Sequence, residues 1–314
     1  MASAVTVAVV GARDQAKELG RKGTTSDITL YNAVRDGHAV TLIEPSGFPE
    51  KFGSLLFALG MADRTLFVVD ALSREVAETA AVVDLFETPV ELALGPAVGE
   101  AELRRAFKGT RLETAPAAPL DYPKLRAALD EWAAPPAPGE VMVRLDHAFP
   151  VKGVGAVALG VVRRGTLKAH DKLRLFPTEK TVEVRSVQVH DVDVPTAATG
   201  ERVGVAIKGV EADELARGQT LAPEGSLRVG TEFAAVVDKP CRYYKGAISE
   251  GLVGNLLIGL QFVPAQVTKG AAGGPLTVET DRPVAHAPGE AAYFSDLSAA
   301  PGPRIAGRLK FRDP

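Results

Sequence analysis

A short segment in the last third of the chain combines cations with aromatic rings. Arg242-Tyr243-Tyr244-Lys245 places two basic side chains around two phenol rings. Basic groups bind phosphates and aromatic rings stack on unpaired bases, so this composition favours contact with RNA. A charged strand edge that stays in solvent would have the same composition. Both interpretations of the segment remain open.

Residues that would support metal-dependent or covalent catalysis are scattered along the chain. The five histidines show no HxxxH or HxH spacing, and His190-Asp191-Val192-Asp193 lacks the pattern of a calcium-binding loop. There is no G-x-S-x-G motif. Because Cys241 is the only cysteine, an internal disulfide, a cysteine-based zinc cluster and a CxxC redox pair are excluded. We expect no metal, no cofactor and no covalent hydrolase chemistry.

The overall composition is that of a globular chain from a reducing compartment. Of the 314 residues, 46% are hydrophobic and 24% are charged, and the net charge is −3. That charge excludes a strongly basic nucleic-acid coat but permits a local RNA-binding face. A single cysteine fits the cytoplasm. The N-terminal apolar run is short and has no basic region before it, so we expect neither a signal peptide nor a membrane-spanning helix.

Strand and helix patterns alternate in the first third of the chain. Apolar β-branched runs predict buried strands, and the segments between them have helical spacing. This alternation predicts a mostly parallel sheet with helices on both faces. The predicted strands are residues 5–10, 39–43, 65–69 and 90–94, and the predicted helices are residues 12–21, 51–61, 73–86, 100–107 and 122–132.

The composition changes at a proline-rich run, which can form neither a helix nor the interior of a sheet and should be a semi-rigid linker. Beyond it, short strand-like segments alternate with turns, which predicts antiparallel barrels. We expect an α/β domain at 1–134, a linker at 135–139, and β-barrels at 140–225 and 226–314. The predicted barrel strands are residues 141–145, 155–162, 172–176, 181–189, 202–207, 233–237, 254–263, 275–278 and 304–311.

The first predicted barrel carries glycines at a characteristic spacing. An Asp-His pair is followed by Phe149, Gly153, Gly155, Gly160 and Gly165, and then by a Gly-x-Arg segment and an Arg-Gly pair. Small barrels need glycines at bends, but this need does not explain the joint order. The pattern resembles the second domain of translational GTPases, and a weaker resemblance extends over the regions on either side. It implies a P-loop-GTPase-like α/β domain followed by two antiparallel β-barrels.

The pair Asp146-His147 looks more like the SelB branch of this family, the selenocysteine-specific elongation factors, than like elongation factor Tu. The resemblance implies that Asp146, His147 and Arg202 line a pocket for the aminoacyl group. An arginine beside an imidazole suits a selenolate anion. The alternative is that the three are solvated polar residues at strand ends. Because the third domain of the family touches tRNA, the resemblance also favours tRNA contact by Arg242, Tyr243 and Lys245.

The resemblance also implies a nucleotide site, whose expected residues have changed. In the P-loop pattern G-x-x-x-x-G-K-[ST], glycines let the backbone wrap a phosphate, the lysine reaches the outer phosphates and the hydroxyl holds Mg²⁺. Gly11 and Lys17 stand at the expected places, but Ala16 replaces the second glycine and Glu18 replaces the hydroxyl residue. A carboxylate at this position repels a triphosphate.

Two further nucleotide signatures have also changed. The Asp-x-x-Gly signature and the catalytic histidine that follows it in translation factors correspond to Glu44, Gly47 and Phe48. The group that would position the attacking water is therefore missing. After the fourth predicted strand, residues 95–98 offer no carboxylate that could recognise guanine. Glu44 follows Gly11 by 33 residues, which is also a short separation for a full switch region.

These observations predict a translation factor homologue that binds aminoacyl-tRNA, or another RNA of translation, and is not a GTP-hydrolysing enzyme. Two alternatives remain open. One is a GTP-binding elongation factor with atypical nucleotide motifs. The other is a scaffold that docks on the ribosome or on another factor, with the pocket as a relic.

Overall fold

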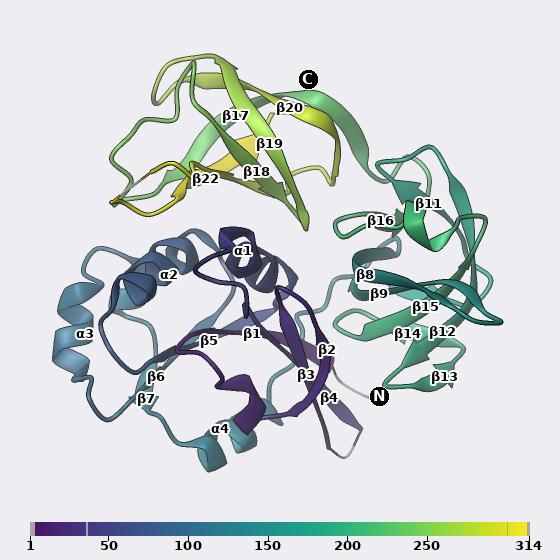
Figure 1. The fold of residues 1–314 in the computed structure, drawn as a ribbon, viewed down its shortest axis with the longest axis horizontal. Coiled ribbons are helices and arrows are strands. Elements are labelled where there is room, and N and C mark those ends of the chain that lie inside the picture. Colours follow the sequence, from purple (N-terminus) through teal and green to yellow (C-terminus); the bar gives the residue numbers. More distant parts are fainter. Residues whose placement is uncertain (1–3, 36, 300, 313–314) are drawn as a thin grey trace. The chain divides into compact units, whose positions relative to one another are not determined.

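The computed structural model describes residues 4–35, 37–299 and 301–312 (Figure 1). The chain forms two compact units. The α/β unit comprises Met1–Ala134, Cys241–Lys245 and Leu297–Ile305, and the barrel unit comprises Pro135–Pro240, Gly246–Asp296 and Ala306–Pro314. The domain boundaries expected at residues 134, 139 and 225 stay predictions. Within the described ranges, no helix has the length and apolar character needed to cross a membrane.

Seven strands form the central sheet of the α/β unit. They are β1 (Ala4–Gly11), β2 (Arg21–Thr25), β3 (Thr29–Arg35), β4 (His38–Glu44), β5 (Arg64–Val69), β6 (Val90–Leu94) and β7 (Ala117–Pro119). Their order in the sheet is β2-β3-β4-β1-β5-β6-β7. The strands from β4 to β7 in this order are parallel, whereas β2 and β3 pair antiparallel. The expected mostly parallel sheet is confirmed.

Helices cover both faces of this sheet. The helices are α1 (Phe52–Met61), α2 (Arg74–Leu85), α3 (Glu100–Ala106) and α4 (Tyr122–Leu129), with 3-10 turns η1 (Ala16–Glu18) and η2 (Arg111–Glu113). On one face, the Thr6 hydroxyl of β1 donates to the carbonyl of Met61 at 2.8 Å. On the other face, Val5 and Val7 of β1 share a core with Leu129 of α4. This follows from the alternation of side chains along a strand.

The helix expected at residues 12–21 is wrong. In its place are the single turn η1 and the edge strand β2, which pairs with β3. The polar residues of this segment are exposed side chains of that edge strand rather than the outer face of a helix. The face of the sheet that such a helix would cover is filled by α4, whose Leu129 packs in the same core as Ala16 and Leu19.

The barrel unit begins with a barrel closed by six strands. Its elements are β8 (Met142–Val151), β9 (Gly155–Arg164), β10 (Thr166–Lys168), β11 (Lys172–Phe176), β12 (Thr181–Val189), β13 (Val192–Val194), β14 (Thr196–Ala198), β15 (Arg202–Lys208), η3 (Ala212–Glu214) and β16 (Thr220–Ala222). The order is β11-β16-β8-β9-β15-β12, closed by pairing of β11 with β12, and β13 is added at β12. The antiparallel barrel expected from the sequence is confirmed.

The second barrel is also closed and antiparallel. Its strands are β17 (Arg228–Pro240), β18 (Val253–Ile258), β19 (Gln261–Lys269), β20 (Pro275–His286), β21 (Ala291–Ser295) and β22 (Ile305–Phe311), in the order β17-β20-β19-β18-β21-β22. The single strand expected at 254–263 is in fact two strands, because Gly259 turns the chain with a φ of +59° inside a continuous apolar run. Strand β21 was not expected.

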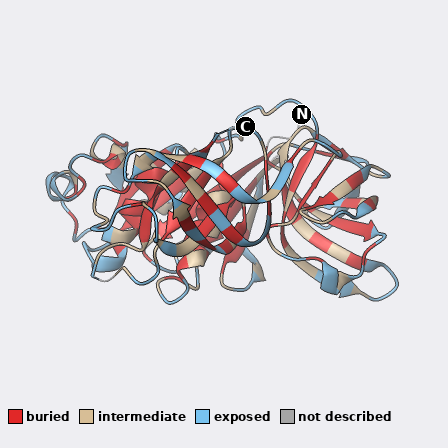
Figure 2. Cartoon of the chain, turned by 90° about the horizontal axis from the view of Figure 1, so that it is seen from above, coloured by how far each residue is buried: buried red, intermediate tan, exposed pale blue. Residues whose placement is uncertain are grey.

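Burial differs between the two kinds of sheet. The central strands of the α/β unit are buried along nearly their whole length, as in β1, where seven of eight residues are buried. Barrel strands such as β12 alternate between buried and more exposed positions, and buried segments form the interior of each sheet (Figure 2). A sheet covered on both faces requires the first pattern, and a barrel with one solvated face requires the second.

Candidate functional site

A β-bulge in β8 positions the predicted Asp-His pair. Leu145 lies opposite Gly160 of β9 and His147 lies opposite Leu159, so Asp146 is an extra residue in β8. Leu145 and Asp146 are therefore both buried although they are consecutive. A regular strand would turn one of them to the other face. The bulge needs Gly160, where a Cβ would lie 2.4 Å from a carbonyl oxygen of β8.

The three residues predicted for the aminoacyl pocket meet at this bulge. Arg202 Nη2 donates to Asp146 Oδ1 at 3.0 Å, and Nη1 donates to Oδ2. His147 Nδ1 lies 2.5 Å from Asp146 Oδ1. The Asp146 side chain is fully buried, whereas those of Arg202 and His147 are 10% and 16% exposed. Strands β8 and β15, which flank β9, thus build one compact polar cluster rather than solvated strand ends.

The charges in this cluster are matched. Burial raises the pKa of Asp146, but the Arg202 guanidinium and the hydrogen bond with His147 outweigh it, so this pKa lies below its usual value. Asp146 is therefore ionised and holds the guanidinium in place. Arg202 uses two of its five N–H donors on Asp146. The remaining donors can bind a carbonyl or an anionic group of a ligand.

A second segment secures the bulge. Arg217 Nε donates to the backbone carbonyl of Asp146 at 3.2 Å, and Gly218 N donates to that of Leu145 at 2.9 Å. Gly218 has a φ of +93°, and a Cβ there would lie 2.7 Å from the Leu260 carbonyl oxygen. The sequence presented this Arg-Gly pair only as part of the family pattern. Nothing else in the sequence indicated that it supports the bulge.

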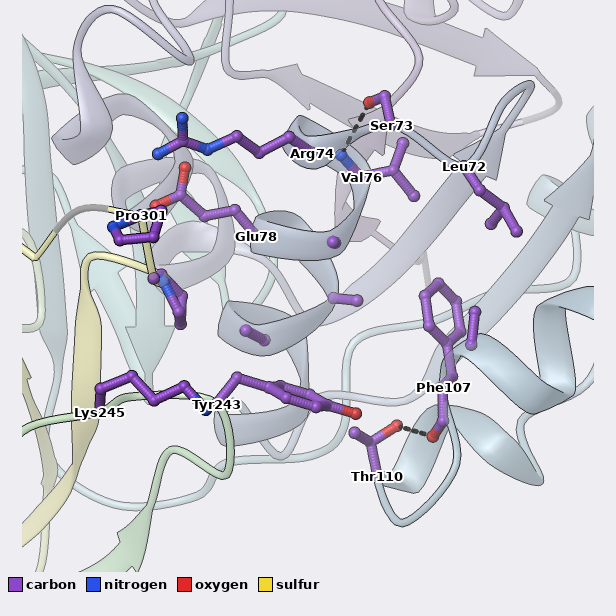
Figure 3. Close-up of a pocket in the computed structure, with 16 residues that line it drawn as sticks. Leu72, Ser73, Arg74, Val76, Glu78, Phe107, Thr110, Tyr243, Lys245 and Pro301 are labelled. Carbon is purple, nitrogen blue, oxygen red and sulfur yellow. Dashed lines mark hydrogen bonds between the residues drawn. The ribbon is translucent and has the colours of Figure 1, made fainter.

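The cationic and aromatic segment Cys241–Lys245 belongs to the α/β unit and is not a strand. Tyr243 and Lys245 line a cavity of about 380 Å³ beside α2 and Phe107 (Figure 3). The Tyr243 hydroxyl lies 3.5 Å from the Lys108 carbonyl oxygen. Arg242 and Lys245 are exposed, and the Tyr243 ring is half-buried. The cations can thus reach a phosphate, whereas the ring would have to leave the cavity to stack on a base.

The loop after β1 leads into the single 3-10 turn η1 and then into β2. Gly11 has a φ of +95°, and a Cβ there would lie 2.1 Å from the Val68 carbonyl oxygen, so glycine is required for packing alone. Ala16 is buried in η1, and Lys17 and Glu18 are exposed. No α-helix occurs among the described residues between β1 and β4. The N-terminal helix dipole that holds phosphate in nucleotide-binding loops is therefore missing there.

Glu44, at the end of β4, reaches into this loop. Its Oε1 accepts a hydrogen bond from Gln15 N at 2.9 Å, and the backbone N–H groups of Ala16 and Asp14 lie close enough to the carboxylate to lower its pKa. Burial raises the pKa of Glu44 more strongly than these hydrogen bonds lower it, and the Asp14 charge raises it too, so the net shift is upward. The sequence showed that Glu44 replaces an aspartate, but not that its carboxylate occupies the loop.

The segment after Glu44 is packed against its neighbours. Phe48 is 7% exposed, and the Arg304 guanidinium lies 5.7 Å from its ring centroid. The Phe48 carbonyl accepts a hydrogen bond from Arg13 Nη2 at 2.9 Å. Gly47 N donates to the Asp27 carbonyl at 2.7 Å, which ties this segment to the turn between β2 and β3. No side chain of Gly47 or Phe48 can act as a base toward water.

Residues 95–98, where the family pattern would place guanine recognition, form a tight turn. Val98 N donates to the Gly95 carbonyl at 3.1 Å, and a Cβ on Gly95 would lie 2.9 Å from Asp70 Cα. Residues 95–98 therefore present backbone rather than a carboxylate. In the part of the chain that the structure describes, no group of three His, Cys, Asp or Glu side chains could hold a metal ion.

The chain is similar to translation elongation factors and to an uncharacterized archaeal protein. The family model "Elongation factor Tu domain 2" matches residues 155–222. An uncharacterized protein of Methanocaldococcus jannaschii is 35% identical over 254 residues, which are 80% of this chain and 82% of that protein. A selenocysteine-specific elongation factor of the same organism is 27% identical over 294 residues; the match covers 83% of this chain and only 61% of that relative's length.

A solved structure shares the fold of the whole chain. The crystal structure of translation elongation factor SelB from Methanococcus maripaludis, in complex with the GTP analogue GppNHp, aligns with a TM-score of 0.83. The alignment covers 99% of this chain and 79% of that chain, at 22% sequence identity. At this identity the likeness concerns the fold, namely an α/β domain followed by two β-barrels.

Proposed function

Because the chain belongs to the SelB-like translational GTPase family, we propose that it binds an aminoacyl-tRNA, or another RNA of translation, without hydrolysing GTP. A contrast within the molecule carries this proposal. The polar cluster of Asp146, His147 and Arg202 is complete and charge-matched, whereas all three nucleotide signatures lack the side chains that their chemistry requires.

In the proposed complex, Arg202 and His147 contact the aminoacyl group. Arg202 is held by Asp146 and is 10% exposed, so it offers donors of fixed geometry at the barrel surface. A preorganised guanidinium loses little entropy when it binds an acyl or anionic group. Asp146 is fully buried and acts by orienting its two neighbours.

The tRNA backbone would be bound by the exposed cations of the segment Cys241–Lys245. Arg242 and Lys245 carry the charge, and Tyr243 sets the position of the segment through its cavity in the α/β unit. Phosphate contacts of this kind add affinity without sequence preference and weaken as salt rises.

The absence of GTP hydrolysis would follow from three local changes. Phe48 is packed under Arg304 and offers no proton acceptor. Glu18 supplies an exposed carboxylate where a hydroxyl would hold Mg²⁺. No carboxylate is present at residues 95–98 to select guanine. Hydrolysis depends on positioning the nucleotide and the attacking water, so these losses act together.

Filter binding with charged and uncharged tRNAs tests this function. We expect the wild-type protein to prefer at least one aminoacylated tRNA, and Arg202→Ala to weaken that binding by tenfold or more while affinity for uncharged tRNA changes little. Arg202→Lys keeps the charge but not the two-donor fork, and should be intermediate. Lys172→Ala removes an exposed cation of the same barrel and serves as the control.

Failure to prefer any tRNA, together with no loss in Arg202→Ala, would overturn the proposal. Isothermal titration with GTP and GDP in Mg²⁺ tests its second half. We expect no heat of tight binding; tight binding would favour an elongation factor with atypical motifs instead.

A further inference from the structure

The loop after β1 already holds an anion that belongs to the chain itself. We propose that Glu44 is a built-in substitute for a nucleotide phosphate: its carboxylate occupies the backbone N–H groups of residues 14–16 and keeps them closed to di- and triphosphates. This role rests on the proposed absence of GTP hydrolysis and gives that absence a physical cause beyond missing catalytic side chains.

Sheet topology brings Glu44 to the loop. β1 and β4 are parallel neighbours, with Ala8 opposite Ile43, so their carboxyl ends lie at the same edge of the sheet. Gly11 ends β1 and Glu44 ends β4. A glutamate is longer by one methylene than the aspartate of the Asp-x-x-Gly signature, and this length suits a carboxylate that spans from β4 to the neighbouring loop.

Three consecutive backbone donors converge on this one carboxylate. Gln15 N donates to Glu44 Oε1 at 2.9 Å, and the neighbouring N–H groups of Asp14 and Ala16 lie close enough to lower the pKa of the carboxyl group. Successive N–H groups that point to a common centre are the arrangement by which protein loops bind phosphate oxygens. Glu44 is 6% exposed, so it sits inside the loop rather than over its mouth.

The surrounding contacts keep the loop in this form. Gln15 Oε1 accepts from the Tyr122 hydroxyl of α4 at 2.5 Å, and Gln15 Nε2 donates to the Arg13 carbonyl at 2.8 Å. Tyr31 of β3 lies beside Glu44, and burial together with the Glu44 charge raises the pKa of its hydroxyl. Residues of α4 on one side and of β3 on the other therefore pack against the loop.

An incoming phosphate would meet negative charge twice. It would have to displace the Glu44 carboxylate from the N–H groups, and it would then face the Asp14 carboxylate beside the same loop. Lys17, the cation that a P-loop would direct at the outer phosphates, is exposed. Like charges at close range in a poorly solvated site repel strongly.

Hydrogen exchange and pyrophosphate titration test this role on the full chain. Glu44→Ala releases the Gln15 N–H and removes the carboxylate beside the Ala16 N–H, so we expect the amides of Gln15 and Ala16 to exchange at least tenfold faster than in the wild type. Inorganic pyrophosphate should then bind Glu44→Ala at least tenfold more tightly than the wild type, and should slow the exchange of those two amides. Glu102→Ala, which removes an exposed carboxylate of α3, is the matched control and should behave as the wild type.

Unchanged exchange in Glu44→Ala, or pyrophosphate binding to the wild type as tight as to that variant, would overturn the proposal. If Glu44→Ala fails to fold, Glu44→Gln tests the same proposal. Glutamine keeps an acceptor oxygen but loses the charge, and charge-assisted hydrogen bonds are roughly twice as strong as neutral ones. Pyrophosphate should therefore bind Glu44→Gln severalfold more tightly than the wild type, and equal affinity contradicts the role of the carboxylate.

These readouts use no tRNA. A positive exchange result with negative tRNA filter binding would refute the proposed function alone. The reverse combination would refute the role of Glu44 alone.

Discussion

Two buried carboxylates, one in each unit, differ in what holds them. Asp146 in the first barrel forms an ion pair with Arg202 and a hydrogen bond with His147. Glu44 in the α/β unit accepts a hydrogen bond from Gln15 N and lies beside Tyr31, and its charged neighbour is another carboxylate, Asp14. The pKa of Asp146 is accordingly lowered and that of Glu44 is raised, although burial pushes both upward.

The difference shows which site has capacity left for a ligand. At the bulge, the carboxylate neutralises a cation that still has donors for another group. In the loop, the carboxylate consumes the donors that a phosphate would need. A complete first site beside a self-filled second one is the arrangement that the proposed function, RNA binding without GTP hydrolysis, requires.

Removing Asp146 should produce the largest effect. Asp146→Ala leaves the Arg202 guanidinium almost buried without its counter-charge. Breaking a buried ion pair in this way costs about 3–5 kcal/mol. Urea unfolding followed by circular dichroism measures the change in the barrel unit. Asp281→Ala removes an exposed carboxylate of β20 and should stay within about 0.5 kcal/mol of the wild type. A loss in Asp146→Ala no larger than in this control would contradict the comparison.

The opposite pKa shifts predict opposite pH dependences. The lowered folded pKa of Asp146 adds stability that is present above its unfolded pKa and is lost as pH falls through the folded pKa. The raised folded pKa of Glu44 adds stability that is present below its unfolded pKa, about 4.3, and is lost as pH rises through the folded pKa. The two carboxylates therefore favour the folded chain at opposite ends of the acidic pH range.

Glu44→Gln makes this difference measurable, because it removes the titrating group of the loop. The melting temperature of Glu44→Gln should rise relative to the wild type as pH increases from 4 to about 7.5. Fluorescence of Trp132, the only tryptophan and a residue of the α/β unit, reports this melting. A difference that is constant with pH would mean that Glu44 titrates in the loop as it does in the unfolded chain.

Substitution of Arg217 should have a smaller effect. It tests whether Arg217 supports the bulge or contacts the ligand directly. Arg217→Ala removes the donor to the Asp146 carbonyl, and hydrogen bonds from charged groups are worth about 1.5–3 kcal/mol. We expect severalfold weaker binding of charged tRNA in filter assays, with Arg217→Lys restoring part of it. A full tenfold loss with unchanged barrel stability would instead make Arg217 a ligand contact.

The sequence predicts buried elements better than exposed ones. The central strands β1, β4, β5 and β6 are continuous apolar runs because both of their faces are covered. Edge strand β2 has exposed Arg21, Lys22 and Gly23, so no burial pattern marks it, and its polar residues suggested a helix. An edge strand forms because it pairs with a neighbouring strand, and the sequence of the edge segment alone does not reveal that pairing.

For the sites, the sequence identifies residues but not their partners. Asp146, His147 and Arg202 were recognised through the family pattern, and their meeting depends on a bulge of one residue that apolar alternation does not reveal. Glu44 was recognised as a departure from that pattern. Its place in the loop depends on the parallel pairing of β1 with β4 and on the replacement of a helix by η1.

The smallest expected effect tests whether burial, rather than charge pairing itself, separates these sites from the surface. Arg13 and Glu50 form an ion pair at 3.3 Å whose side chains are 63% and 72% exposed. Solvent screens such pairs, and they contribute about 0–1 kcal/mol. Glu50→Gln should therefore shift the Trp132 unfolding midpoint very little, and less in 1 M salt, where the screening length is about 3 Å. A loss comparable to that of Asp146→Ala would show that the Arg13 end of the loop depends on this pair, and the contrast between buried and exposed carboxylates would fail.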